Sequence, residues 1–288
     1  MMPAELIIGI LSGLAVVILL IVVSRGFFTL FVQEQVRYLR LIVLTTPLPF
    51  VTGYRSEPGP VGQYLAQAAG ERRDPAGCVH IRYTGRVRYG KTGRWMKMSG
   101  EAFFSLATPG FVEHAKISWA PGIWLDAFHY YIRHEARMRL SLFSVIPLYR
   151  ARGEEIKDSS LFRYLAGTPL FPLIFKGSGF ICWESIHESL AKAIIRDEDR
   201  SVEARVRFDK SGWIESIEAS RTTHPATGKR IPGLVSCRFS EYTTVGGYQV
   251  PVQVAAELVL WGGKSFDAEY SITGIEFDVS KIKKPEGS

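Results

Sequence analysis

An uncharged run of 18 residues, "LIIGILSGLAVVILLIVV" at positions 6–23, constrains this chain more than any other feature. As a helix rising about 1.5 Å per residue, it would span roughly 27 Å, close to the thickness of the hydrocarbon core of a bilayer. A cleaved signal peptide is the alternative, but the run is long and no small-residue cleavage site follows it before Arg25. We therefore expect residues 1–25 to form a transmembrane anchor, which makes the protein single-pass and the membrane its first partner.

The flanks of this run say little about its orientation. The N-terminal flank carries only the amino group and Glu5, whereas Arg25, Arg37 and Arg40 follow the run. The positive-inside rule would then keep the rest of the chain in the cytoplasm. The charge bias is small, so the sequence leaves the membrane side of the following domain open.

The next segment, residues 26–60, is expected to lead out of the membrane. Positions 26–51 are apolar but are interrupted by five polar residues, Gln33, Glu34, Gln35, Arg37 and Arg40. A second membrane span would have to bury these groups at a cost of several kcal/mol. We expect instead a juxtamembrane helix with its apolar side chains near the interface. The stretch "TTPLPFVTGYRSEPGP" is rich in proline and turn residues and predicts a linker.

Composition excludes some classes of protein. The net charge of +7 comes from 35 basic and 28 acidic residues, without a dense basic cluster or a nucleic-acid motif, so no nucleic-acid partner is predicted. The three cysteines, Cys78, Cys182 and Cys237, are far apart and show no CxxC spacing. Neither a metal nor another cofactor is therefore predicted.

Alternation of apolar and polar residues dominates positions 61–280. It is clear in "HIRYTGRVRY" (80–89) and "SVEARVRF" (201–208), and turn sequences such as "DKSG" and "WGGK" separate such runs. This pattern indicates an antiparallel sheet with one covered and one wet face. Helical spacing is confined to positions 61–70 and to "DSSLFRYLAG". We predict a mainly β fold with helices (α+β), a curved antiparallel sheet or half-barrel around short helices, and a disordered tail at 281–288.

The stretch "FHYYIRHEARMRLSL" (128–142) combines two histidines with a glutamate. Its alternation is nearly unbroken, which predicts a strand with His129 and Glu135 on a wet face and His134 on a dry one. The spacing fits no HExxH metal motif, and the two histidines point to opposite faces, so no metal site is expected. His134 is then either a core histidine satisfied by hydrogen bonds or part of a cavity wall.

A second polar residue interrupts an apolar strand face in "PGFVEHAKISW" (109–119). Glu113 shares its face with Phe111, Ile117 and Trp119, and a carboxylate there needs a partner or a raised pKa. If the strands are neighbours, Glu113 and His134 could pair in a pocket and form an acid–base centre. The alternative places Glu113 at a strand end, in water.

Five ordered stretches resemble a family of uncharacterised bacterial membrane-anchored proteins: "PGFVEHAKI", "LFRYLAGTPLFP", "CWESIHESLAKA", "VRFDKSGWI" and "GGYQVPVQVAAELVLW". The resemblance covers roughly positions 61–279 and implies a lipoprotein-carrier (LolA/LolB-like) half-barrel in the bacterial cell membrane, without an established activity. This chain departs from the family pattern at three positions. Glu113 replaces a tryptophan, His129 an aspartate and Gly167 an acidic residue, so no catalytic residue is carried over.

The sequence thus favours a membrane-anchored, non-enzymatic module that binds a lipid or another apolar ligand in a concave cleft of the sheet. The alternative is a structural or interaction subunit of a membrane or envelope complex, with a membrane-protein partner. The third possibility is the acid–base enzyme that uses Glu113 and His134. The predicted cleft residues are Phe111, Glu113, Ile117, Trp119, Tyr130, His134, Met138 and Trp183.

Overall fold

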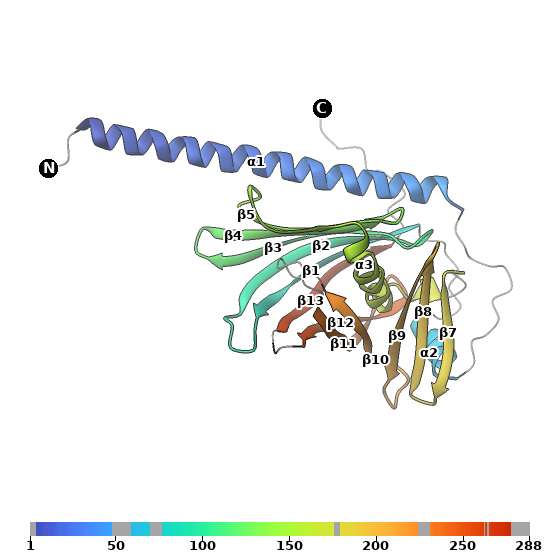
Figure 1. Cartoon of the computed structure of the whole chain (residues 1–288). Helices are drawn as coiled ribbons and strands as arrows, with labels where there is room; N and C mark the ends of the chain where they lie inside the picture. Colours follow the sequence, from blue (N-terminus) through green and yellow to red (C-terminus); the bar gives the residue numbers. More distant parts are fainter. Residues whose placement is uncertain are drawn as a thin grey trace.

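The computed structural model describes residues 4–47, 59–69, 77–175, 179–223, 231–261, 263 and 265–277. Within these ranges the chain forms a long N-terminal helix, four shorter helical segments and one large sheet (Figure 1). The helical segments are α1 (Ala4–Thr45), α2 (Gly59–Ala69), α3 (Glu154–Gly167) and the 3-10 helices η1 (Thr168–Leu170) and η2 (Pro172–Phe175). The predicted tail at 281–288 and most of the predicted linker lie outside the described residues.

The described residues contain 13 strands, which form one antiparallel sheet in the order β6-β5-β4-β3-β2-β1-β13-β12-β11-β10-β9-β8-β7. Their bounds are β1 (Cys78–Tyr89), β2 (Met96–Ser105), β3 (Phe111–Ala120), β4 (Ile123–Ile132), β5 (Glu135–Leu142), β6 (Ile146–Arg152), β7 (Ile181–His187), β8 (Leu190–Asp197), β9 (Arg200–Phe208), β10 (Ile214–Thr223), β11 (Ile231–Val245), β12 (Tyr248–Leu260) and β13 (Ser265–Phe277). Neighbours in the sheet are also neighbours in sequence, except where β13 pairs with β1. That pairing joins the two halves of the sheet.

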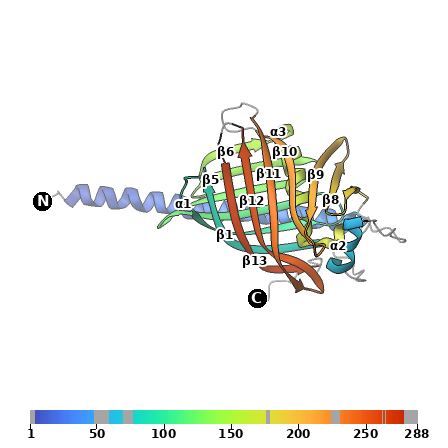
Figure 2. The ribbon, with the colours of Figure 1, turned by 90° about the horizontal axis from the view of Figure 1, so that it is seen from below.

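The sheet is curved, and the helices that connect its two edge strands lie inside the curve (Figures 1 and 2). The chain passes from β6 to β7 through α3, η1 and η2, whose apolar side chains fill the concave side together with those of α2. Leu161, Tyr164, Leu165, Phe171 and Ile174 are fully buried there. The expected half-barrel is therefore present, and short helices occupy much of its interior.

The C-terminal half of α1 lies on the opposite, outer face of the sheet (Figure 1). One stripe of α1 packs against residues of β2, β3 and β4. Burial of each such side chain contributes about 1.5–3 kcal/mol, so this stripe holds the helix firmly on the sheet. The stripe consists of Phe28, Val32, Val36, Leu39 and Ile42, and the sheet contributes Phe103, Val112, Phe128, Tyr130 and Ile132.

The structure changes two predictions about the first 60 residues. The expected anchor and the expected juxtamembrane helix are parts of one continuous helix of 42 residues. The second half of this helix packs on the outer face of the sheet, a contact that the sequence did not predict. For this reason most of β4 is covered on both faces, whereas β9 shows the expected alternation of buried and exposed positions. The alternation of β4 therefore did not separate a dry face from a wet one.

Candidate functional site

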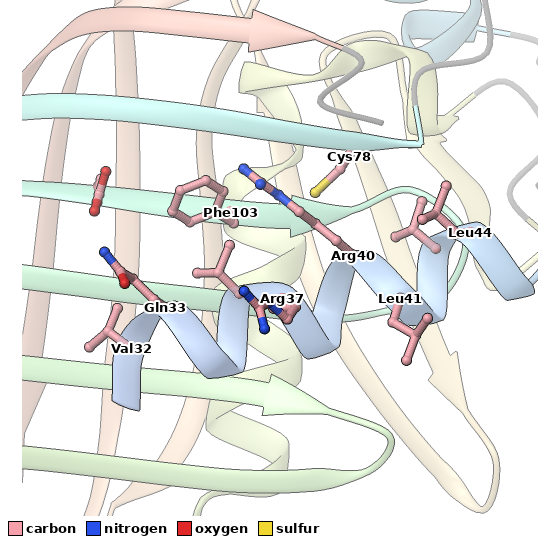
Figure 3. Close-up of a pocket in the computed structure, with 11 residues that line it drawn as sticks. Val32, Gln33, Arg37, Arg40, Leu41, Leu44, Cys78 and Phe103 are labelled. Carbon is pink, nitrogen blue, oxygen red and sulfur yellow. The ribbon is translucent and has the colours of Figure 1, made fainter. Parts of the chain in front are cut away.

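A pocket of about 510 Å³ lies between α1 and the outer face of the sheet (Figure 3). One wall is the surface of α1 from Val32 to Leu44, and the other is formed by β1 and β2. The lining is mostly apolar, with polar groups added by two arginines, one glutamine and one glutamate. The lining residues are Val32, Gln33, Val36, Arg37, Arg40, Leu41, Val43, Leu44, Cys78, Glu101 and Phe103.

Arg40 is the cation that reaches deepest into this pocket. Its guanidinium lies over the ring of Phe103, 5.5 Å from the ring centroid, and Figure 3 shows the side chain reaching from α1 into the space between Phe103 and Cys78. The Nε–H of Arg40 is buried and has no hydrogen-bond partner among the described residues. A buried donor without an acceptor is costly, so the site favours an anionic or carbonyl oxygen at this point.

The sheet side of the pocket is built around Phe103 and Cys78. His80 stacks on Phe103 at 4.1 Å, and its Nε2 lies 3.0 Å from an oxygen of Glu101. This hydrogen bond lowers the pKa of the Glu101 carboxyl, which stays ionised at neutral pH. Burial raises the pKa of the Cys78 thiol to about 12, which keeps it protonated and unreactive.

A second polar cluster lies on the concave side, between α3 and the sheet. Arg163 of α3 donates from Nε and Nη2 to the two oxygens of Glu113 on β3, at 3.0 and 2.8 Å. The hydroxyl of Tyr83 on β1 donates to the same carboxylate at 2.8 Å. Burial alone would raise the pKa of Glu113, but Arg163 and these hydrogen bonds hold it below its usual value. The carboxylate is therefore ionised and fully bonded.

His129 of β4 is the cross-strand neighbour of Glu113 and belongs to the same cluster. Its Nε2 lies 2.8 Å from the hydroxyl oxygen of Ser160 on α3. Burial lowers the pKa of His129 to about 4, so the imidazole is neutral at pH 7. The prediction that His129 faces water is wrong, because this face of β4 is covered by α3. All partners of the cluster are within the protein, and its evident effect is to fix α3 on the sheet.

His134 occupies a tight turn and not a strand. Arg133 and His134 have φ angles of 47° and 63°, and they join β4 to β5 as a two-residue hairpin. Nδ1 of His134 lies 2.8 Å from Asp197 and Nε2 lies 2.9 Å from Glu198, in the turn between β8 and β9. The histidine therefore ties the two halves of the curved sheet together across the concave side. Glu113 and His134 have separate partners, and the predicted acid–base pair between them is not formed.

The other predicted cleft residues do not share one wall. Phe111 is fully buried in the main core, and Met138 and Trp183 pack against that core. Ile117 belongs to a smaller apolar cluster, and Trp119 is half exposed. Tyr130 lies on the outer face beneath α1, which corrects its placement in the concave cleft. Whether any of these residues touches a ligand stays a prediction.

The pocket residues on α1 were not singled out from the sequence. The signal that points to them is the spacing of Phe28, Val32, Val36, Leu39 and Ile42, which repeats at three or four residues. That spacing predicts one buried stripe and therefore a docked helix. Within the described residues no group of three or more histidine, cysteine, aspartate or glutamate side chains is placed to hold a metal ion. The three thiols are free.

Together, the described fold is an open antiparallel half-barrel with helices inside it and one long apolar helix on its outer face. The chain belongs to a family of unknown function (DUF6544), whose family model matches residues 55–270. The family assignment suggested by the five sequence stretches is confirmed. No curated protein matches the chain.

Several solved structures are similar to this chain at low identity. A putative outer membrane lipoprotein-sorting protein domain from Vibrio parahaemolyticus is 11% identical, with 80% of this chain and 96% of that chain covered and a TM-score of 0.41. A LolA superfamily protein from Nitrosomonas europaea is 11% identical, with 75% and 91% covered and a TM-score of 0.36. A DUF1329 family protein from Desulfovibrio piger is 12% identical, with 78% and 96% covered and a TM-score of 0.36.

Proposed function

We propose that this protein is a single-pass, membrane-anchored, non-enzymatic module that binds an anionic lipid. The observation that carries this proposal is the 510 Å³ pocket, which has mostly apolar walls and lies on the same helix as the apolar N-terminal segment. The acyl part of the ligand lies between α1 and Phe103, and Arg40 binds the anionic group. The site therefore differs from the concave cleft expected from the sequence, because helices fill that side.

The anchoring role rests on the N-terminal half of α1. In the described part of the chain α1 is the one helix that is long and apolar enough to cross a membrane, and its most apolar window is not buried in the protein. Residues 7–23 span about 24 Å along the helix axis at 1.5 Å per residue, which suits a bilayer core. The apolar side chains of this segment are not buried in the protein, so they would be exposed to water without a bilayer. Because the exposure of apolar surface to water is unfavourable, a bilayer is the natural environment of this segment.

The size and chemistry of the pocket suit an amphipathic lipid. Small-molecule sites measure roughly 300–1,000 Å³ and combine apolar walls with a few polar groups that fix orientation. This pocket has that composition, with Arg37 and Arg40 as cations and Glu101 as its anion. A charge-assisted bond to an anionic headgroup would satisfy the unpaired Nε–H of Arg40.

Binding of a fluorescent fatty acid to the full chain in mild detergent tests the proposal. Arg40→Gln is expected to weaken binding by about tenfold to a hundredfold, the worth of a hydrogen bond to a charged group at roughly 1.5–3 kcal/mol. Arg25→Gln is the matched control, because Arg25 lies on the same helix over the ring of Trp124 but outside the pocket. Equal affinities of the two variants would contradict the assigned role of Arg40.

A second pair of variants tests the location of the apolar part. Leu41 lines the pocket, whereas Leu30 is an exposed leucine of the same helix that does not. Leu41→Trp is expected to fill the pocket and abolish uptake of the fatty acid, and Leu30→Trp is expected to leave uptake unchanged. Uptake that survives Leu41→Trp would place the ligand elsewhere.

The alternative function, a subunit of an envelope complex, has one observation in its favour. Where α1 packs on the sheet, its outward side still exposes Phe27 and Leu30, and Leu41 and Leu44 at the edge of the pocket are exposed as well. Such a stripe suits a second apolar helix, which would cover it by side-chain packing. Under this alternative Leu30→Trp would disrupt a stable complex while fatty-acid uptake would be absent from the unaltered protein.

A further inference from the structure

The end of the sheet that faces the apolar half of α1 can be identified from side-chain contacts. The guanidinium of Arg25 lies over Trp124, 5.3 Å from the ring centroid, at the start of β4. Further along α1, Phe28 packs on Phe128, and Leu39 reaches Gly110 beside the far end of β4. The helix thus runs along β4, and its N-terminal part projects beyond the turn between β3 and β4 (Figure 1).

Four hairpins reach this same end of the sheet. Pairing brings Leu142 beside Leu125, Ser118 beside Lys97, and Val87 beside Ala268. The turns that follow connect β1 to β2, β3 to β4, β5 to β6 and β12 to β13. We call this set of turns and the adjoining strand ends the anchor-side rim.

Exposed apolar side chains gather on the anchor-side rim. Outside α1, ten large apolar residues of the described chain are exposed, and eight of them lie on or within four residues of these turns. A ninth, Leu234 on β11, pairs with Val259, two residues before the turn between β12 and β13. Trp261 is the most open of these, with 74% of its surface exposed. The nine are Tyr89, Trp119, Ile123, Val145, Ile146, Leu148, Leu234, Trp261 and Phe266, and the tenth, Ile186, lies on β7 near the opposite end.

The charges of the rim are predominantly positive. Exposed cations are Lys91, Arg94, Lys97 and Arg150. The carboxylates nearby are already engaged: Asp267 pairs with Arg88, Glu269 with Arg86, and Asp126 is buried and accepts hydrogen bonds from Trp124 and Ser144. The rim therefore combines tryptophan and tyrosine rings, aliphatic side chains and unneutralised cations.

We propose that the anchor-side rim docks on the surface of the bilayer, with its aromatic and aliphatic side chains among the headgroups of anionic lipids. Tryptophan and tyrosine are enriched at this depth of a membrane, and lysine and arginine side chains are attracted to an anionic surface. The occupant is a lipid surface and not a protein, because α1 is one unbroken helix whose apolar segment starts where it passes the rim. A bilayer that surrounds residues 7–23 therefore meets the rim as well.

This docking rests on the anchoring part of the proposed function and is independent of a ligand in the pocket. It fixes the orientation of the domain, with β1 to β6, β12 and β13 meeting the membrane end-on. The pocket then begins about 12 Å from the bilayer, since Val32 lies eight residues after Ser24. A lipid would reach it by moving along α1.

A depth measurement on the full chain in vesicles of anionic phospholipid tests the docking. Ile146→Cys and Ile186→Cys form a matched pair, since the two isoleucines are 52% and 53% exposed at opposite ends of the sheet. Each is labelled with the environment-sensitive dye NBD in a Cys182→Ser background, because the remaining thiols of Cys78 and Cys237 are buried. A third label at Val16→Cys reports insertion of α1.

The expected result is blue-shifted emission of the label at position 146, with severalfold quenching by a lipid that carries a nitroxide near its headgroup, and no change at position 186. Quenching at position 16 with a water-like label at 146 would refute the docking and leave the anchor standing. Absence of quenching at both 16 and 146 would refute the anchor and the docking together, whatever the pocket binds.

Discussion

The ion pair between Glu113 and Arg163 offers the sharpest test of how α3 is held on the sheet. Glu113→Gln keeps the size of the side chain and an oxygen that can accept from Tyr83, but it leaves the charge of Arg163 without a partner. In the unaltered protein the Glu113 carboxylate accepts three hydrogen bonds, two of them from Arg163. The substitution therefore removes the negative charge and replaces one acceptor oxygen with an NH2 group, which cannot accept a hydrogen bond from Arg163.

The size of the stability loss caused by Glu113→Gln follows from the burial of the ion pair. Removing one partner of a buried ion pair costs about 3–5 kcal/mol. The side chains of Glu113 and Arg163 keep 16% and 24% of their surface exposed, so we take the lower end of that range. In a domain of this size 1 kcal/mol corresponds to about 2–4 °C in Tm, and a loss of about 3 kcal/mol predicts a decrease of roughly 6–12 °C.

Thermal unfolding of the full chain in mild detergent, followed by circular dichroism, measures the decrease. The double variant Glu113→Gln with Arg163→Met is the control, because it removes both charges and is expected to recover at least half of the lost Tm. Since the pKa of Glu113 is lowered in the fold, its contribution is present above the unfolded pKa and is lost as the pH falls through the folded pKa. A Tm of Glu113→Gln within 2 °C of the unaltered protein would refute this reasoning.

Three further predictions follow from other contacts. His129→Gln is expected to make Tm depend less on pH between 6.5 and about 4. The reason is that burial keeps His129 neutral in the folded protein in this range, whereas the same side chain takes up a proton in the unfolded chain. An unchanged slope of Tm against pH would contradict the burial of His129. Leu39→Ala is expected to lower the stability by about 2–5 kcal/mol and to speed alkylation of Cys78 beneath α1, measured by mass spectrometry. Leu30→Ala is the control, because Leu30 is exposed and lies outside the pocket that Cys78 lines; equal alkylation rates in the two variants would mean that α1 is not docked. Arg133→Asn is expected to raise the Tm by a few degrees, because asparagine adopts the positive φ of the turn between β4 and β5 more readily than arginine does. A decrease in Tm would argue against that turn conformation.

The class of fold could be predicted from the sequence because alternation and turn residues are local signals. β9, with buried and exposed residues in strict alternation, shows the pattern that the sequence displays. α2 and α3 begin and end within a few residues of the expected positions. The order of strands, and above all the pairing of β1 with β13, depends on contacts between distant residues that no local pattern encodes.

The partners of the buried polar residues could not be predicted from local sequence patterns. Alternation placed Glu113 on an apolar face, and this face is indeed inside. It could not supply the partner, because Arg163 lies 50 residues away on a helix. The turn at Arg133 and His134 was mistaken for strand, because a two-residue turn preserves the alternation of apolar and polar residues on either side of it. The turn became visible only from the φ angles and the register between β4 and β5.

The three positions at which the sequence was interpreted as departing from the family pattern lie close together in the fold. Glu113 and His129 are cross-strand neighbours, and a side chain at Gly167 would come within 3.5 Å of the guanidinium of Arg163. The three unusual positions thus lie around one ion pair.

The central claim, that the pocket between α1 and the sheet holds an anionic lipid, is tested most directly by native mass spectrometry of the full chain released from lipid nanodiscs. The unaltered protein, Arg25→Gln and Leu30→Trp are predicted to retain one lipid whose fragments identify an acyl chain with an anionic group. Arg40→Gln and Leu41→Trp are predicted to lose it. Retention of the same lipid by all five proteins, or by none of them, would contradict the account.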